Sequence, residues 1–179
     1  MYTPIITFSP LTHQDFSLLL VWLSMPHVKA YWDPDIAWTP DLVQKKYDTY
    51  VAGYKYVNGV KKEIHAFIIC VDNSPVGFAQ YYNVHDFPRS KVQSWIDQLP
   101  ASCASFDFYI GDPAYVGKGF GAPILATFLQ TYVWPHFKTC FVNPEKSNKA
   151  AIRVYEKTGF AMYDQTTATV LMIAHCSAK

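Results

Sequence analysis

Charged residues are scarce in this sequence of 179 residues, and the two signs balance. Only 16% of the residues are Asp, Glu, Lys or Arg, and the net charge is +1. A surface that binds duplex nucleic acid carries a clear excess of basic residues, so we expect no nucleic-acid partner. Half of the residues are hydrophobic and 17% are aromatic, which is typical of a folded globule. The length suits a single domain over residues 1–179.

Cysteine is also sparse and shows no metal-binding spacing. Cys70, Cys103, Cys140 and Cys176 form no C-x-x-C pair, and no neighbouring histidine completes a zinc motif. We therefore expect no metal. A chain of this size can build a full core without disulfides, which favours buried, reduced thiols and a cytoplasmic protein.

Long apolar runs are absent. The longest run near the N-terminus is LLLVWL, residues 18–23, whereas a membrane-spanning helix needs about 20 apolar residues. The first residues also lack a basic stretch followed by an apolar one, so we expect no signal peptide. The sequence therefore predicts no membrane partner.

The periodicity of the remaining residues predicts one mixed α/β sheet, in the order β-α-α-β-β-β-α-β-α-β-β. Strands are predicted at 5–11, 65–71, 75–84, 106–111 and 138–143, and two more within 160–176. Helices are predicted at 12–23, 41–54, 121–133 and 147–158, with residues 85–102 irregular.

Cap and turn residues set the limits of these elements. Thr12, Thr39 and Ser147 are predicted helix caps, and Pro26 is predicted to stop the first helix. Gly159 is predicted to follow the last helix in the left-handed conformation. Residues 72–74, Asp-Asn-Ser, predict a hairpin turn between two strands.

A glycine-rich turn stands between a predicted strand and a predicted helix, in the stretch FDFYIGDPAYVGKGFGAPILATFL, residues 106–129. A nucleotide-triphosphate loop requires G-x-x-x-x-G-K-[ST]. Here five residues separate Gly111 from Gly117, and Gly119 stands where Ser or Thr must bind magnesium. A dinucleotide-binding turn requires G-x-G-x-x-G, a spacing that this turn also lacks. Both nucleotide motifs are excluded.

The same turn is suited to an anion that needs no metal. Gly117, Gly119 and Gly121 allow the main chain to approach a ligand closely, and the following helix adds partial positive charge. Lys118 adds a mobile cation. A pyrophosphate fits this description; a tight turn without a ligand is the alternative.

A second stretch, NPEKSNKAAIRVYEKTGF at residues 143–160, makes the pattern specific. Together with VGKGFGAPIL it resembles the two acyl-CoA signatures of the GNAT superfamily of N-acetyltransferases. The resemblance implies a single-domain GNAT fold: a mixed, mostly antiparallel sheet of about six or seven strands flanked by about four helices. It also implies acetyl-CoA as co-substrate. The residues it assigns to acetyl-CoA binding are Phe108, Tyr109, Ile110, Val116, Gly117, Lys118, Gly119, Phe120, Gly121, Ala122, Asn148 and Ala151.

Two residues are candidates for catalysis. The resemblance gives Tyr155 the role of supplying a proton or a hydrogen bond to the departing thiolate, because a phenol pKa of about 10 is close to a thiol pKa of roughly 8.5. Asp107 interrupts an apolar strand, and alternation places it opposite Phe106 and Phe108. Asp107 is the candidate base. A core tyrosine and an outward-facing strand aspartate are the structural alternatives.

Within the superfamily, DFYIGDPAYVGKGFG and its flanking segments resemble the aminoglycoside 6′-N-acetyltransferases. An aspartate matches Asp107 in that branch, whereas the siderophore-precursor branch tends to carry histidine. The aminoglycoside enzymes often have an aspartate at the position of Asn143, where it contacts a substrate ammonium. The residues implied to line the acceptor site are Tyr31, Trp32, Asp33, Tyr82, His85, Asp86 and Asn143; a surface loop is the alternative for His85 and Asp86.

These observations predict an acetyl-CoA-dependent N-acetyltransferase that acts on a primary amine of a small aminosugar. Transfer is expected to be direct, because no cysteine stands in the glycine-rich turn or on the helix of Tyr155. A siderophore-precursor acyltransferase and a non-catalytic acyl-CoA-binding module are the alternatives. The protein is expected to be a monomer or a homodimer.

Overall fold

The structure is a computed structural model that describes residues 3–176. Seven strands form a sheet in the order β1-β4-β5-β6-β7-β9-β8, and β2 and β3 form a separate hairpin. The large sheet is mostly antiparallel, with β6 and β7 parallel. Four helices have eight residues or more, so the predicted GNAT architecture is confirmed.

The chain forms two compact units. The first comprises the residues up to Gln80 together with Phe108–Phe120. Its elements are β1 (Ile6–Pro10), α1 (Phe16–Leu23), α2 (Pro26–Lys29), α3 (Pro40–Val51), β2 (Tyr54–Val57), β3 (Val60–Glu63) and β4 (His65–Val71). Strands β5 (Ser74–Asn83) and β6 (Cys103–Ile110) begin in one unit and end in the other.

The second unit comprises Tyr81–Asp107 and the residues from Gly121 onward. Its elements are α4 (Gln93–Ile96), α5 (Gly121–Phe128), a π-helical turn (Leu129–Val133), β7 (Thr139–Val142), α6 (Lys149–Lys157), β8 (Ala161–Gln165) and β9 (Val170–His175). The expectation of one domain over residues 1–179 stays a prediction.

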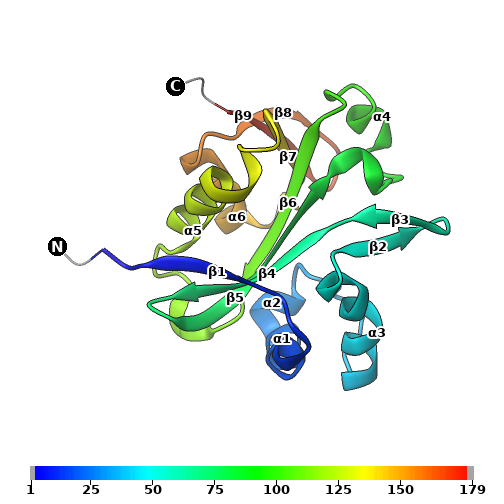
Figure 1. Cartoon of the computed structure of the whole chain (residues 1–179). Coiled ribbons are helices and arrows are strands. Elements are labelled where there is room, and N and C mark those ends of the chain that lie inside the picture. The colour runs from blue at the N-terminus through cyan, green and yellow to red at the C-terminus, as the bar shows by residue number, and fades with distance from the viewer. Residues whose placement is uncertain (1–2, 177–179) are drawn as a thin grey trace. The chain divides into compact units, whose positions relative to one another are not determined.

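In the first unit, aromatic side chains fill the core. Tyr47 on α3 is fully buried and contacts Phe78 on β5 edge-on, with ring centroids 5.5 Å apart. Phe78 in turn stacks on Tyr109 at 5.7 Å. Helices α1 and α3 pack against each other, as Figure 1 shows. Such ring pairs stabilise the fold by more than the burial of their apolar area alone would.

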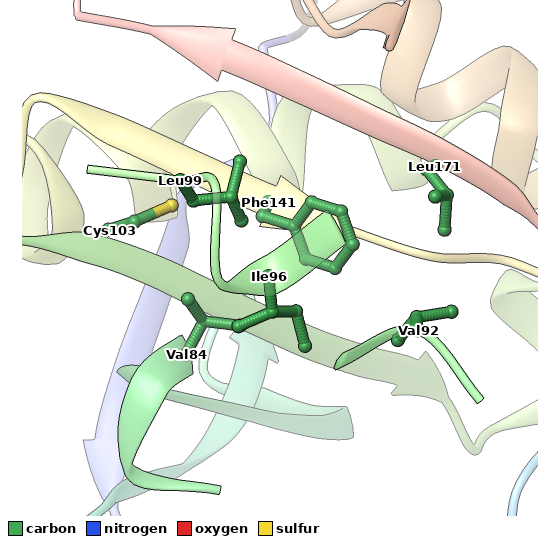
Figure 2. Close-up of a cluster of buried hydrophobic side chains, with 7 residues drawn as sticks. All are labelled: Val84, Val92, Ile96, Leu99, Cys103, Phe141 and Leu171. Atoms are coloured by element: carbon green, nitrogen blue, oxygen red, sulfur yellow. The ribbon is translucent and has the colours of Figure 1, made fainter. Parts of the chain in front are cut away.

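In the second unit, the segment predicted to be irregular supplies part of the core. Val92, Ile96 and Leu99, in and around α4, are buried against side chains of three strands. Figure 2 shows this cluster, which comprises Val84, Val92, Ile96, Leu99, Cys103, Phe141 and Leu171. Residues 85–102 are therefore held in place by hydrophobic contacts, although their sequence shows no helical or strand period.

Several predicted boundaries are confirmed. Thr39 caps α3 by accepting a hydrogen bond from the Leu42 N–H, and Gly159 follows α6 with φ +92°. Asp72 and Asn73 form the predicted hairpin turn with φ +50° and +64°. Asparagine and aspartate reach this left-handed region at lower cost than other side chains.

Other boundaries were wrong. Helix α1 does end at Leu23, as predicted, but Pro26 also begins a second helix, α2, that was not predicted; a proline at the first helical position has no N–H to leave unpaired. Asn148, and not Ser147, caps α6, since its side chain accepts from the Ala151 N–H at 3.1 Å. Helix α3 ends at Val51, three residues before the predicted end, and the β2–β3 hairpin was not predicted.

None of the four cysteines, all of which lie within residues 3–176, forms a disulfide. Cys103 and Cys140 are buried, as predicted, and burial raises the pKa of Cys103 to about 12. Cys70 and Cys176 are only half-buried, so the prediction of four buried thiols was wrong for these two.

Candidate functional site

The glycine-rich turn has the open geometry that an anion site requires. Gly117 and Gly119 have φ +71° and +88°, and no protein atom lies within 4 Å of a Cβ placed on either. The left-handed conformation favours glycine at both positions, while the empty space around them leaves room for a ligand.

Main-chain donors line this turn. The Asp112 carboxylate accepts from the Ala114 N–H at 2.9 Å and starts a short 3₁₀ turn, in which the Val116 N–H donates to the Pro113 carbonyl at 3.3 Å. The Val116 N–H is thus already used by the protein and is not available to a ligand. Within residues 3–176, the N–H groups of Gly117 to Phe120 donate to no main-chain carbonyl within hydrogen-bond distance. These free donors, directly before α5, fit a pyrophosphate.

Close packing fixes the start of α5 against α6. A Cβ on Gly121 would lie 2.8 Å from Val154 Cγ2, so only glycine fits there. Helices α5 and α6 lie side by side in Figure 1. Ala122 follows in the first turn of α5, where main-chain N–H groups are free of helical bonds. The side chain of Lys118 is exposed.

The predicted pantetheine strand, Phe108 to Ile110, is the last part of β6. The ring of Tyr109 is buried in the aromatic core, so only its main chain remains for a ligand. The Ile110 carbonyl accepts from His27 Nε2 at 3.0 Å, which was not predicted. At the start of α6, the side-chain oxygen of Asn148 accepts a hydrogen bond from the Ala151 N–H. This helix cap does not use the side-chain NH₂ group of Asn148.

Strands β6 and β7 pair over only three residues each. The parallel register runs from Cys103↔Thr139 to Ser105↔Phe141, and both strands continue beyond the last pair. Asp107 lies in this continuation and is half-buried. Its neighbour Phe106 is fully buried against Phe128, with ring centroids 4.6 Å apart. The burial of Phe106 agrees with the predicted alternation, but Phe108, predicted to share its face, is only half-buried, so the orientation of Asp107 stays a prediction.

The Asp107 carboxylate has a fixed hydrogen-bond partner. The hydroxyl of Tyr82, at the end of β5, donates to Asp107 Oδ2 at 2.8 Å. Burial, and then the charge of Asp107, raise the pKa of Tyr82 well above the ordinary phenol value. Tyr82 therefore keeps its proton and holds one carboxylate oxygen in place.

Tyr155 is 7% exposed, on the buried side of α6. Burial, followed by the charge of Asp107, raises its pKa well above the ordinary phenol value, while Arg89 acts in the opposite direction. The phenol is neutral at every physiological pH. With its pKa so far above that of a thiol, it is better suited to donate a hydrogen bond to a sulfur atom than to release its proton completely.

A buried arginine, not predicted from the sequence, completes this cluster. The Arg89 guanidinium donates to the Asn143 side-chain carbonyl, to the Tyr82 hydroxyl and, at 2.8 Å, to Ser105 Oγ. Its partners come from β5, β6 and the end of β7. Because they are distant in sequence and Arg89 lies in a segment without periodicity, no local pattern indicates this contact.

The aromatic N-terminal residues lie in the first unit. The Trp32 ring contacts Tyr109 at 4.9 Å, and Asp33 forms an ion pair with Lys46 at 2.5 Å. Tyr31 is 44% exposed. The indole N–H of Trp38 and the hydroxyl of Tyr109 are buried without a hydrogen-bond partner among the described residues, so a polar ligand or water would satisfy them.

The histidine-aspartate pair lies just after β5. His85 Nε2 contacts the Pro100 carbonyl at 2.9 Å, which holds the 85–102 segment together. The structure therefore shows a structural contact for this ring. A role for His85 or Asp86 in acceptor binding stays a prediction.

Neither a metal cluster nor a membrane helix is found in the described part of the chain. No group of three or more His, Cys, Asp or Glu residues between residues 3 and 176 is arranged to hold a metal ion. Over the same residues, every helix is too short or too polar to cross a bilayer.

The fold and the donor-lined turn define an acyl-CoA-dependent acetyltransferase. The family model of the acetyltransferase (GNAT) domain matches residues 12–168, and the chain belongs to this family. The predicted superfamily and enzyme class are confirmed.

Individual relatives are more distant. The chain is 25% identical over 158 residues to the aminoglycoside N(6′)-acetyltransferase type 1 of Klebsiella pneumoniae and, equally, to that of Serratia marcescens; the match covers 87% of this chain and 73% of each relative. The crystal structure of the aminoglycoside acetyltransferase AAC(6′)-Ib with coenzyme A superimposes with a TM-score of 0.79 at 22% identity, over 96% of this chain and 95% of that one. The spermidine N-acetyltransferase of Vibrio cholerae, with CoA and spermine, has a TM-score of 0.71 at 14% identity, with 95% of both chains covered. At these identities the structural matches show the shared fold.

Proposed function

We propose that this protein transfers the acetyl group of acetyl-CoA directly to a primary amine of a small aminosugar, as an aminoglycoside 6′-N-acetyltransferase does. The observation that carries the proposal is the turn at Gly117–Phe120, directly before a helix, whose N–H groups donate no main-chain hydrogen bond and whose Gly117 and Gly119 have open space around them. The similarity to the aminoglycoside enzymes over 87% of the chain supports the choice of acceptor.

The residues of the turn and of α6 fit the co-substrate. The N–H groups of residues 117–122, together with Lys118, would bind its pyrophosphate, and the main chain of Phe108–Ile110 its pantetheine arm. Asn148 and Ala151 would lie beside that arm at the start of α6. Acetyl-CoA supplies an acetyl group activated as a thioester.

Asp107 is proposed to act as the base. An aliphatic amine is protonated at neutral pH, so it must lose a proton before it can attack a carbonyl carbon. The Asp107 carboxylate, oriented by the hydrogen bond from Tyr82, accepts this proton directly or through one water. The acceptor amine then forms the new N–C bond while the C–S bond breaks.

Tyr155 is proposed to stabilise the departing sulfur. Its neutral phenol donates a hydrogen bond as negative charge develops there, which lowers the barrier more than it stabilises the ground state. Tyr31, Trp32, Asp33, Tyr82, His85, Asp86 and Asn143 are proposed to line the acceptor site.

Release of free thiol from acetyl-CoA, measured with a panel of aminoglycosides, tests the proposal. We expect turnover with compounds that carry a 6′-amine and none with 6′-hydroxyl analogues. Turnover only with hydroxylated diamines would assign the protein to the siderophore-precursor acyltransferases. Binding of acetyl-CoA without turnover on any amine, unchanged by Tyr155→Phe, would indicate a non-catalytic module.

A further inference from the structure

The Arg89 guanidinium is a fixed positive charge close to the proposed base. Its Nη2 donates to the Tyr82 hydroxyl, and the same hydroxyl donates to Asp107 Oδ2 at 2.8 Å. Two hydrogen bonds therefore separate the cation from the carboxylate. The positive charge of Arg89 therefore acts on whatever group of an acceptor lies on the Tyr82 side of Asp107.

The direct partners of this cation are all uncharged. The guanidinium donates to the Asn143 amide, the Tyr82 hydroxyl and Ser105 Oγ, and it lies 5.7 Å from the Tyr82 ring centroid. Within the described residues, these contacts use three of its five N–H groups. The remaining two are available to a bound molecule.

Arg89 also keeps its charge. Burial acts to lower the pKa of the guanidinium, but Tyr82 and Asp107 outweigh it, and the pKa is raised above its ordinary value. The main-chain N–H of Arg89 donates to Gln93 Oε1 at 2.9 Å, and the hydrophobic cluster of Val92 and Ile96 follows. The cation cannot move away without breaking these contacts.

The Asn143 amide carries a donor group beside its acceptor oxygen. A guanidinium has only donors, so the oxygen of the Asn143 amide must face Arg89, and its NH₂ group is directed elsewhere. An aspartate at this position would instead present acceptor oxygens and a negative charge. In this protein the pair offers N–H donors and one positive charge.

We propose that Arg89 and Asn143 select an acceptor whose group next to the reacting amine is a hydroxyl or a carboxylate, and that they reject a second ammonium there. An ammonium has only donors and would meet both the N–H groups and the positive charge. A hydroxyl or carboxylate oxygen accepts from both residues. This inference rests on the proposed acetyl transfer at Asp107 and narrows its acceptor class.

Two acceptors with the same reacting amine test the inference: methyl 6-amino-6-deoxyglucoside and its 4,6-diamino-4,6-dideoxy analogue, in which an ammonium replaces the hydroxyl nearest to the 6-amine. We expect the unmodified protein to have a kcat/KM roughly tenfold higher for the monoamine, the effect of one like charge at a partly buried site. In Arg89→Gln, which removes the charge, the ratio should fall to about one. Arg89→Lys, which keeps the charge, should retain the ratio of the unmodified protein.

Asn143→Asp is a second variant that does not depend on the folding of Arg89→Gln. The new carboxylate pairs with Arg89, so the preference for the monoamine should again disappear. Two outcomes would overturn the inference and leave the proposed function intact. The first is acetyl transfer in which neither Arg89→Gln nor Asn143→Asp changes the ratio of kcat/KM between the two sugars. The second is a preference of the unmodified protein for the diamine. No transfer to either sugar or to any aminoglycoside would overturn the proposed function and this inference with it.

Discussion

Replacing Gly119 by alanine tests whether the glycine-rich turn binds the pyrophosphate. In the free protein the new methyl group has room, since no atom lies within 4 Å of it, and the penalty comes only from φ +88°. That left-handed strain costs about 1–2 kcal/mol, which corresponds to a fall in Tm of about 2–8 °C for a protein of this size.

The effect on acetyl-CoA binding should be larger than this strain. Relaxing φ turns the flanking N–H groups away, and each lost hydrogen bond to a charged oxygen costs about 1.5–3 kcal/mol. The Kd for acetyl-CoA, measured by isothermal titration calorimetry, should therefore rise by about 10- to 150-fold.

Gly59→Ala is the matched control. Gly59, in the β2–β3 turn, has φ +79° and also has no atom within 4 Å of an added Cβ, so the expected loss of Tm is the same. The Kd of the Gly59→Ala variant for acetyl-CoA should equal that of the unmodified protein. If both variants raise the Kd equally, or if Gly119→Ala leaves it unchanged, the turn is not the pyrophosphate site.

Four further predictions follow from the site and its surroundings. Tyr155→Phe should lower kcat by about 10- to 100-fold with little change in the KM for acetyl-CoA, because the hydrogen bond to sulfur strengthens as charge develops; an equal rise in KM would indicate a packing role. Asp107→Asn should abolish most turnover at neutral pH but leave the binding of acetyl-CoA intact by calorimetry, and retained activity would exclude Asp107 as the base. Gly121→Ala should destabilise the fold by about 1–3 kcal/mol in urea unfolding, because its Cβ would lie 2.8 Å from Val154; an unchanged midpoint would show that α5 and α6 can move apart. The Gln165 main-chain N–H and, to a smaller extent, the Trp95 indole N–H donate to Asp164 and lower its pKa below 3.8, so its contribution to stability is present above that pH and is lost as the pH falls through the lowered value. The Tm difference between the protein and Asp164→Asn should therefore shrink in melts below pH 3.8, and a difference that grows on acidification would contradict the assignment.

Local chemistry was enough to predict most of the fold. The Asp72-Asn73 turn and Gly159 after α6 adopt the left-handed conformations that these residue types favour. The β2–β3 hairpin was missed although its turn, Asn58-Gly59, carries a strong hairpin signal and has φ +50° and +79°. Ser147 and Asn148 are adjacent good caps, and only the contact with the Ala151 N–H distinguishes them.

The candidate site was predictable only where one segment contains it. The glycine-rich turn is a continuous stretch, so its spacing alone excluded two nucleotide motifs. Asp107 stood out because it interrupts an apolar strand. Arg89 has no such signal, since Tyr82, Ser105 and Asn143 meet it only after three strands come together. Side-chain networks of this kind depend on tertiary structure and not on local periodicity.

The hydrophobic attachment of residues 92–99 has a consequence for how such an enzyme diversifies. Val92, Ile96 and Leu99 attach the 85–102 segment through hydrophobic contacts in which Arg89 takes no part. A substitution of Arg89 would leave these contacts, and the separate glycine-rich turn, unchanged. A change of amine preference would require few substitutions in this one segment, and laboratory selection for new acceptors should concentrate there.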